Sequence, residues 1–348
     1  MAPFVSDGYR IIACVQKKKD LMTGACPAIR LRKDQNLTIV QFADLHLGEN
    51  DAQDHKTLAL MQSILAAETP AFVVFSGDQV SGYAIPSDDR RRVLWSQAVE
   101  VAAESGVPFA TLFGNHDDQP YRLDTLLWHR QALWLCLAAL LLLLFFRRAH
   151  RATRMALAVS LPVLATVAWI TRASRATRDM LLAHERALAP LLSYTHAPCV
   201  RLRADHASAT LHFFDSGGGR IPEAMPFFVD PRAFHNEGAA LAFVHIPPAP
   251  WRYDPALCDD GRHTERPSEC AGSDVLMDTL VRMGVRGVFV GHDHGNAWCC
   301  RIDGMLRCYG AHTGFGGYDD ADAPRGARVI EVHATDHTVT SRLVVVTV

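Results

Sequence analysis

Short apolar runs alternate with amphipathic segments through the first third of the chain. Apolar runs at residues 37–43, 71–75 and 108–113 are separated by segments 56–67 and 90–104, in which apolar residues recur three and four positions apart. Short runs rich in β-branched and aromatic residues are typical of buried strands, whereas the wider spacing indicates helices that pack on a sheet. The alternation predicts an α/β domain with largely parallel strands.

The second half of the chain continues in the same way. Most further apolar runs end in a glycine, proline or polar turn, and an amphipathic helix is predicted at residues 273–283. A hairpin is expected around Asp303-Gly304, because this dipeptide is typical of tight turns between strands. The remaining predicted strands, with their turns, cover residues 211–219, 240–248, 287–294, 328–333 and 338–346.

An apolar region interrupts this pattern. Residues 132–146 and 155–170 are almost wholly apolar, and the connector 147–154 between them carries four arginines. A helix that spans a bilayer usually needs roughly 20 apolar residues, so both segments are slightly short. Three interpretations stay open: a transmembrane hairpin within residues 126–170, two helices packed on the domain, or sequence foreign to the protein. The chain is therefore divided into an N-terminal extension (1–36), an α/β domain in two parts (37–122 and 175–348) and an apolar insertion (123–174).

The net charge and the N-terminal sequence limit which partners and which location in the cell we expect. The formal net charge is −2, and no basic stripe interleaved with aromatic residues stands out, so we expect no nucleic-acid partner. The first residues lack the charged start and apolar core of a secretory signal. We expect a location at a membrane through residues 126–170, or otherwise the cytoplasm.

The nine cysteines form no CxxC pair, which argues against a zinc ribbon or a thioredoxin-type site. Their odd number does not resemble a complete disulfide framework. A bridge between Cys258 and Cys270, or one within the set Cys299, Cys300 and Cys308, is compatible with their positions.

Polar clusters stand at the ends of five predicted strands. They are Asp44-Leu45-His46, Gly77-Asp78, Gly114-Asn115-His116-Asp117, His245 and Gly291-His292-Asp293-His294. A single cluster of this kind is more often an ordinary turn or a solvated loop than a site. Five of them at strand ends are hard to produce by chance, because functional groups collect at the carboxyl ends of parallel strands. Oxygen and imidazole donors without sulfur suit Fe, Mn or Zn.

The order of these motifs resembles that of the calcineurin-like metallophosphoesterases. Finer features are similar to the purple-acid-phosphatase-related branch of single-domain plant and fungal phosphatases. They are FADLHLGE (42–49), VFSGDQVSG (74–82), FGNHDD (113–118), FVHIPP (243–248), GHDHGNAWCC (291–300) and YGAHTGFGGY (309–318). The resemblance implies a β-sandwich flanked by helices, in four layers (αββα), with the apolar helical hairpin as an insertion.

The resemblance also implies roles for individual residues. Two metal ions are expected, the first on Asp44, His46 and His294, the second on Asn115, His245 and His292, with Asp78 as the bridge. A hydroxide shared by the two ions would attack phosphorus. His116 would donate a proton to the leaving oxygen or bind the phosphoryl group, with Asp117 orienting its ring. The alternative for His116 is a structural histidine beside the ligands.

Two positions depart from the branch. Purple acid phosphatases carry an iron-binding tyrosine three residues after the bridging aspartate, where this chain has Ser81, and Tyr83 lies two residues further on. Ala311 stands where the branch tends to have arginine. His312 and Thr313 are candidate phosphate neighbours, with a structural loop as the equal alternative.

The function implied is that of a metal-dependent phosphatase for phosphomonoesters, on protein or on small molecules. Two alternatives stay open. One is a phosphodiesterase or nuclease that uses the same two-metal site. The other is a membrane-tethered binding protein without activity.

Overall fold

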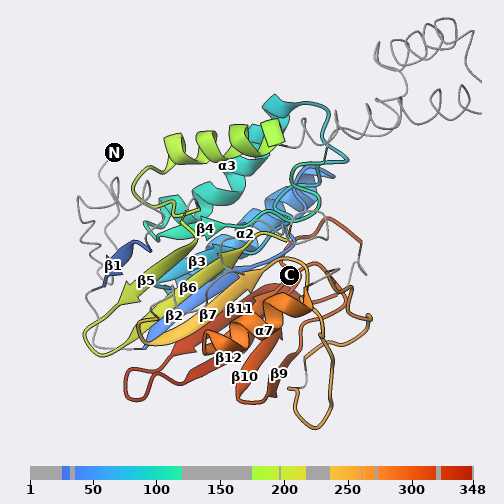
Figure 1. The fold of residues 1–348 in the computed structure, drawn as a ribbon. Helices are drawn as coiled ribbons and strands as arrows, with labels where there is room; N and C mark the ends of the chain where they lie inside the picture. The colour runs from blue at the N-terminus through green and yellow to red at the C-terminus, as the bar shows by residue number, and fades with distance from the viewer. Residues whose placement is uncertain are drawn as a thin grey trace, which may run out of the picture.

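Two β-sheets lie at the centre of the fold (Figure 1). The structure is a computed structural model, and it describes residues 26–31, 36–119, 175–195, 197–216, 236–259, 261–270, 273–318 and 323–346. The five-stranded sheet has the order β12-β11-β2-β3-β4 and the seven-stranded sheet the order β1-β5-β6-β7-β8-β10-β9.

The strands of the five-stranded sheet are β2 (Leu37–Phe42), β3 (Phe72–Phe75), β4 (Phe109–Thr111), β11 (Arg325–Val332) and β12 (Val339–Val346). Those of the other sheet are β1 (Ala28–Arg30), β5 (Cys199–Arg203), β6 (Ser208–Phe214), β7 (Ala239–Val244), β8 (Val285–Val290), β9 (Cys299–Ile302) and β10 (Met305–Tyr309). Both sheets are mixed. The parallel neighbours are β2-β3-β4, β6-β7-β8-β10 and β1-β5, whereas β9-β10, β5-β6, β11-β12 and β2-β11 are antiparallel.

The prediction of largely parallel strands is therefore right only for part of each sheet. Connections too short for a crossover force neighbouring strands to run antiparallel, as in the β9–β10 hairpin at Asp303-Gly304. That hairpin was expected from its turn residues. The strands β1 and β5 had no counterpart among the predicted elements.

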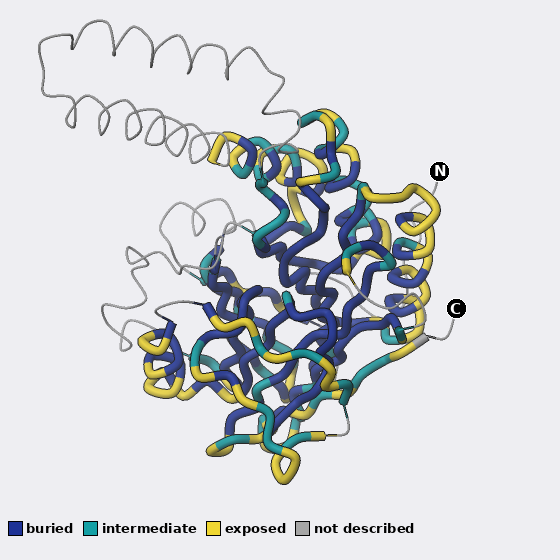
Figure 2. The backbone as a smooth tube through the Cα atoms, turned by 90° about the vertical axis from the view of Figure 1, so that its right-hand side faces the viewer, coloured by how far each residue is buried: buried dark blue, intermediate teal, exposed yellow. Residues whose placement is uncertain are grey.

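Apolar side chains between the layers explain how the sheets are stacked. Ile39 and Phe72 of the first sheet share a buried cluster with Leu211 and Leu241 of the second, so the sheets pack face to face. The helices α2 (Asp51–Glu68) and α3 (Asp88–Glu104) cover the outer face of the five-stranded sheet, and α7 (Asp274–Arg282) covers the other outer face. In Figure 2 the buried stretches of the described chain lie at the centre, and the exposed stretches lie toward the outside. This mixed α/β arrangement of helix, sheet, sheet and helix agrees with the expected sandwich.

Both N-terminal helices begin earlier than their apolar spacing predicts. The side chain of Asn50 accepts hydrogen bonds from the backbone N–H groups of Ala52 and Gln53, and Ser87 accepts one from Arg90. These caps satisfy donors of the first turn, where the residues are polar and leave no mark in the hydrophobic pattern. A further helix covers residues 175–188.

Three disulfides are formed among the described cysteines. They join Cys26 to Cys199, Cys258 to Cys300 and Cys299 to Cys308. The alternative bridge between Cys258 and Cys270 is wrong, because the loop after β7 brings Cys258 opposite Cys300, to which it is joined. A bridge within the set Cys299, Cys300 and Cys308 is confirmed.

The helices in the described part of the chain are each too short or too polar to span a bilayer. The predicted hairpin lies outside the described residues, because the insertion 123–174 falls within residues 120–174. Nothing in the described part supports it, and the membrane location that depends on it stays a prediction.

Candidate metal centre

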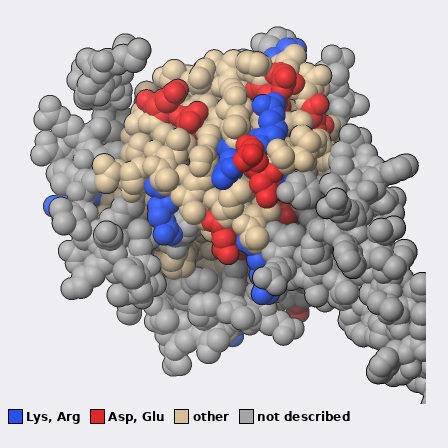
Figure 3. Space-filling model, turned by 90° about the horizontal axis from the view of Figure 1, so that it is seen from above, with Lys and Arg blue, Asp and Glu red and all other residues tan. Residues whose placement is uncertain are grey.

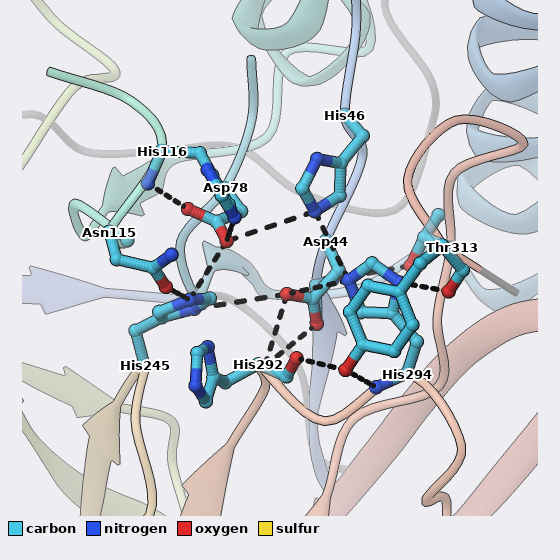
Figure 4. A network of polar contacts seen from close by, with 12 residues as sticks. Asp44, His46, Asp78, Asn115, His116, His245, His292, His294 and Thr313 are labelled. Carbon is cyan, nitrogen blue, oxygen red and sulfur yellow. Dashed lines mark hydrogen bonds and ion pairs between the residues drawn. The ribbon is translucent and has the colours of Figure 1, made fainter. Parts of the chain in front are cut away.

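The carboxyl ends of five strands meet at one edge of the two sheets. Asp44 and His46 follow β2, Asp78 follows β3, and Asn115 follows β4. His245 follows β7, and the segment after β8 carries His292 and His294. Figure 4 shows all seven predicted ligands turned toward one another.

Four of these ligands have an unusual backbone. Asp44, His46, Asp78 and His292 have φ angles of 57°, 49°, 55° and 77°, in the left-handed region that non-glycine residues rarely adopt. Such a conformation costs on the order of 1–3 kcal/mol per residue and persists only where the surrounding structure imposes it. Its concentration on four ligand residues indicates that the fold holds these side chains in place for a function.

Glycines let the loops approach one another closely. A Cβ atom on Gly114 would lie 2.1 Å from Asp78 Oδ1, and one on Gly77 would lie 2.3 Å from His245 Nδ1. A Cβ atom on Gly291 would lie 2.7 Å from Asp44 Oδ2. Gly77 also has a φ of +111°. At these positions glycine is required chiefly because another ligand residue fills the space that a side chain would occupy.

The donor atoms form two buried groups. Asp44, His46 and His294 make one and Asp78, His245 and His292 the other, with the donor atoms of each group within 4.8 Å of one another. Asp78 lies between them, because its Oδ2 is 3.1 Å from His245 Nε2 and 3.7 Å from His46 Nε2. Asn115 joins the second group, since its Oδ1 is 3.2 Å from His245 Nε2. This grouping agrees with the division that the resemblance implies, and the bridging role of Asp78 stays a prediction.

The imidazole rings are oriented by contacts on their Nδ1 side. Nδ1 of His245 lies 3.0 Å from the carbonyl oxygen of Ser76, and Nδ1 of His294 lies 2.8 Å from that of Tyr318. A carbonyl oxygen can only accept, so both rings carry the proton on Nδ1 and present Nε2 to the centre of the site. Within the first group, Nε2 of His46 lies 3.1 Å from Nε2 of His294. The donor set therefore fits metal ions.

The buried histidines of the two groups have strongly shifted pKa values, and the shifts differ in direction. Burial lowers the pKa of His46 to about 3 and that of His292 to about 4, although nearby carboxylates oppose the shift, so both rings are neutral. Burial also opposes the charged form of His245, but the neighbouring Asp78 carboxylate outweighs it and raises the pKa of His245 to about 10. Asp78 opposite it has its pKa lowered, because the histidine charges outweigh burial.

His116 stands beside the ligand groups, as predicted. Its ring is partly exposed, and Nε2 lies 4.0 Å from Asp78 Oδ2. The predicted role of Asp117 as the group that orients this ring is wrong. The Asp117 carboxylate instead accepts hydrogen bonds from the backbone N–H groups of Asp78, Val80 and Gly114, at 2.9, 3.0 and 2.7 Å.

The residue that faces Nδ1 of His116 is Gln119, whose Oε1 lies 3.1 Å away. Asp117 thus fixes the loops that carry Asp78 and Asn115, and Gln119 holds the ring. Proximity in sequence suggested the aspartate, but its buried side chain turns inward to the backbone amides of the neighbouring loops.

His312 and Thr313 both lie close to the first group. The ring of His312 packs on that of His294 at a centroid distance of 3.9 Å. The Thr313 hydroxyl accepts a hydrogen bond from the backbone N–H of Ala43, and the residue is fully buried. For Thr313 these contacts favour the structural loop over a phosphate neighbour.

Sequence reasoning missed two side chains that support the site. Tyr318 stacks on His294 at 4.1 Å, and its hydroxyl donates to Glu265. Glu49 accepts hydrogen bonds from Ser81 and Tyr83. The glycine pair before Tyr318 was the available signal, because a Cβ atom on Gly317 would lie 2.5 Å from His294 Cε1.

Tyr83 does not replace the missing tyrosine ligand. Its phenol is bonded to Glu49, and burial, together with that hydrogen bond, raises the pKa of Tyr83 to about 12, which keeps the phenol protonated.

Comparison with known proteins identifies the family. A model of the calcineurin-like phosphoesterases matches residues 37–296. The chain belongs to this family. Two relatives from Arabidopsis thaliana are named probable inactive purple acid phosphatases 29 and 28. The first is 23% identical, over 92% of this chain and 83% of its own length. The second is 27% identical, over 87% of this chain and 77% of its own length.

Among solved structures, a purple acid phosphatase from yellow lupin seeds is similar to this calcineurin-like phosphoesterase, with a TM-score of 0.46 and 10% sequence identity. The match covers 90% of this chain and 53% of the lupin chain. The named relatives place the chain in the purple-acid-phosphatase-related branch, as its motifs indicated.

Proposed function

We propose that this calcineurin-like phosphoesterase is a metal-dependent phosphatase that hydrolyses phosphomonoesters. The observation that carries the proposal is the convergence of oxygen and imidazole donors from five strand ends into two groups with Asp78 between them. Donors of this kind suit Fe, Mn or Zn. When bound, two such cations would screen the charge of a phosphate and lower the pKa of a water molecule enough for it to act as nucleophile.

The protein's own residues hold this arrangement and supply a proton. Asp78 is fixed from both ends, since its Oδ1 accepts from the backbone N–H of His116 at 2.8 Å and its own N–H donates to Asp117. The ring of His116 reaches the edge of the site and is partly exposed. It is placed to give a proton to the leaving oxygen, a step that in enzymes is typically worth about 10²–10⁴-fold in rate.

Charge supports a small phosphorylated substrate or a phosphoprotein over a nucleic acid. The net charge is −2, and in Figure 3 acidic and basic side chains are intermixed on the described part of the face shown. Binding of a nucleic-acid backbone relies on clustered lysine and arginine side chains.

One observation favours a second candidate, a metal-binding protein without phosphatase activity. The two Arabidopsis relatives are named probable inactive. Against this, the present chain has all seven donors, and they converge in space. Loss of activity in this type of site is expected when a donor is lost, because a cation then lacks a ligand.

The test is hydrolysis by the purified protein supplied with Mn²⁺ or with Fe and Zn. We expect turnover of p-nitrophenyl phosphate in preference to bis-p-nitrophenyl phosphate. Asp78→Asn should abolish it, while the exposed turn variant Asp205→Asn should leave it unchanged. Activity that survives Asp78→Asn or thorough chelation contradicts the proposal. Preference for the diester moves the assignment to a phosphodiesterase, and two bound metals without turnover support the inactive binding protein.

A further inference from the structure

Three side chains that are not ligands connect to His46 of the first group. Nδ1 of His46 lies 2.8 Å from Ser81 Oγ, and Ser81 Oγ lies 2.5 Å from Glu49 Oε1. The phenol of Tyr83 donates to the same carboxylate oxygen. We call Glu49, Ser81 and Tyr83 the Glu49 network.

The direction of each hydrogen bond follows from the chemistry of the groups. An ionised carboxylate only accepts, so the Ser81 hydroxyl proton points to Glu49. The oxygen of Ser81 then has only lone pairs to offer His46, which must donate from Nδ1. This assigns the proton of His46 to Nδ1 and leaves the lone pair of Nε2 for a metal ion. Nε2 indeed faces the site, 3.1 Å from His294 Nε2.

The support of His46 differs from that of the other two rings. His245 and His294 donate from Nδ1 to neutral backbone carbonyls, of Ser76 and Tyr318. His46 alone among these three is connected, through one hydroxyl, to a carboxylate. A carboxylate that accepts from a ligand histidine fixes its tautomer and makes the ring a stronger donor to the metal.

The network also reaches His116. The ring of Tyr83 meets the ring of His116 edge to face at a centroid distance of 5.0 Å. Through the Ser81 hydroxyl, Glu49 therefore holds His46 of the first group. Through the Tyr83 hydroxyl, it holds the ring that packs against His116.

We propose that Glu49 and Ser81 are positioning residues that strengthen metal binding at Asp44, His46 and His294. Ser81 stands where purple acid phosphatases place a tyrosine ligand, and here it serves as the link between a ligand histidine and a carboxylate. The inference rests on the proposed function only in taking these groups as a metal centre. It requires no turnover.

The experiment measures Mn²⁺ binding to the metal-free full-length protein by calorimetry and electron paramagnetic resonance. Loss of such an outer partner typically weakens metal affinity about 10–100-fold. We expect Ser81→Ala to weaken one of the two bound equivalents by about that factor and the other by less than threefold. Ser81→Thr keeps the hydroxyl and should restore binding, and Glu49→Gln should lie between, because its amide oxygen still accepts but carries no charge.

Two control variants separate this role from a general loss of structure. Ser63→Ala removes a hydroxyl on the exposed face of α2, and Glu104→Gln removes a charge at the end of α3, both outside the site. Neither should change either affinity, and circular dichroism should show all variants folded. Equal affinities in Ser81→Ala and wild type, or equal weakening of both equivalents, overturn the inference. Wild-type protein that binds two ions with this pattern but hydrolyses nothing would instead contradict only the proposed function.

Discussion

Arg178 ties the segment that follows the insertion to the loop that carries Asn115 and His116. Its guanidinium forms ion pairs with Asp118, at the end of that loop, and with Asp215, just after β6. The same group lies over the ring of Phe113 at 4.7 Å. Replacing it by methionine, Arg178→Met, keeps most of the apolar stem and removes the charge.

The expected cost follows from the burial of the three charges. Removing one partner of a fully buried pair costs about 3–5 kcal/mol, mainly because the remaining charge is left uncompensated. The side chains of Arg178, Asp118 and Asp215 are 21%, 15% and 33% exposed, so water screens part of this. The lost contact with Phe113 adds about 0.5–1 kcal/mol. We expect a decrease in the free energy of unfolding of about 2–3 kcal/mol.

The assay is equilibrium unfolding in urea of the metal-free protein, with Arg92→Met as the matched control. Arg92 pairs with Asp89 on the surface of α3, where the side chains are 42% and 83% exposed, and such pairs contribute about 0–1 kcal/mol. If the two variants lose the same stability, the reasoning about Arg178 is refuted. The cost comes from carboxylates that have lost their cationic partner. Adding Asp118→Asn and Asp215→Asn to Arg178→Met should therefore recover part of the lost free energy of unfolding.

Three further predictions concern the metal centre. Gly114→Ala should reduce bound metal to less than one equivalent, measured by metal analysis of the folded protein, because the new Cβ would displace Asp78; two full equivalents would contradict the close approach. Since the pKa of His245 is about 10 in the metal-free protein, this ring is protonated at pH 8.5 and must lose its proton to bind a cation. Calorimetry in buffers of different ionisation enthalpy should show about one proton released, and affinity rising with pH toward 10; no release would refute the charged state. His116→Ala should lower kcat about 10²–10⁴-fold with unchanged metal content, whereas equal loss of metal would make this residue structural.

The fold was predictable as far as local pattern determines it. The apolar runs of β2, β3, β7 and β8 are buried on both faces and could be recognised from composition alone. The first residues of the helices and the directions of the strands were harder to predict from the local pattern. The first turn of α2 depends on the cap at Asn50, and the antiparallel pairing of β11 with β2 joins segments that lie far apart in the chain.

The sequence by itself indicated the candidate donors of the proposed metal centre, through the clusters at strand ends and the resemblance to the family. Each donor directly follows a buried strand or lies in the turn after it, and parallel strands deliver their carboxyl ends to one edge. Side-chain type then decides which residues can donate to a cation.

Only the tertiary structure decided what holds each donor. The bond from Ser81 to Glu49, the turn of Asp117 toward buried amides and the bridge between Cys258 and Cys300 all join side chains whose approach depends on how distant loops pack. Periodicity reports whether a residue faces the core, but it carries no information on which residue of another loop arrives beside it. Ser81 stands where related phosphatases have a tyrosine ligand. Its role in linking His46 to a carboxylate could therefore be seen only in the folded chain.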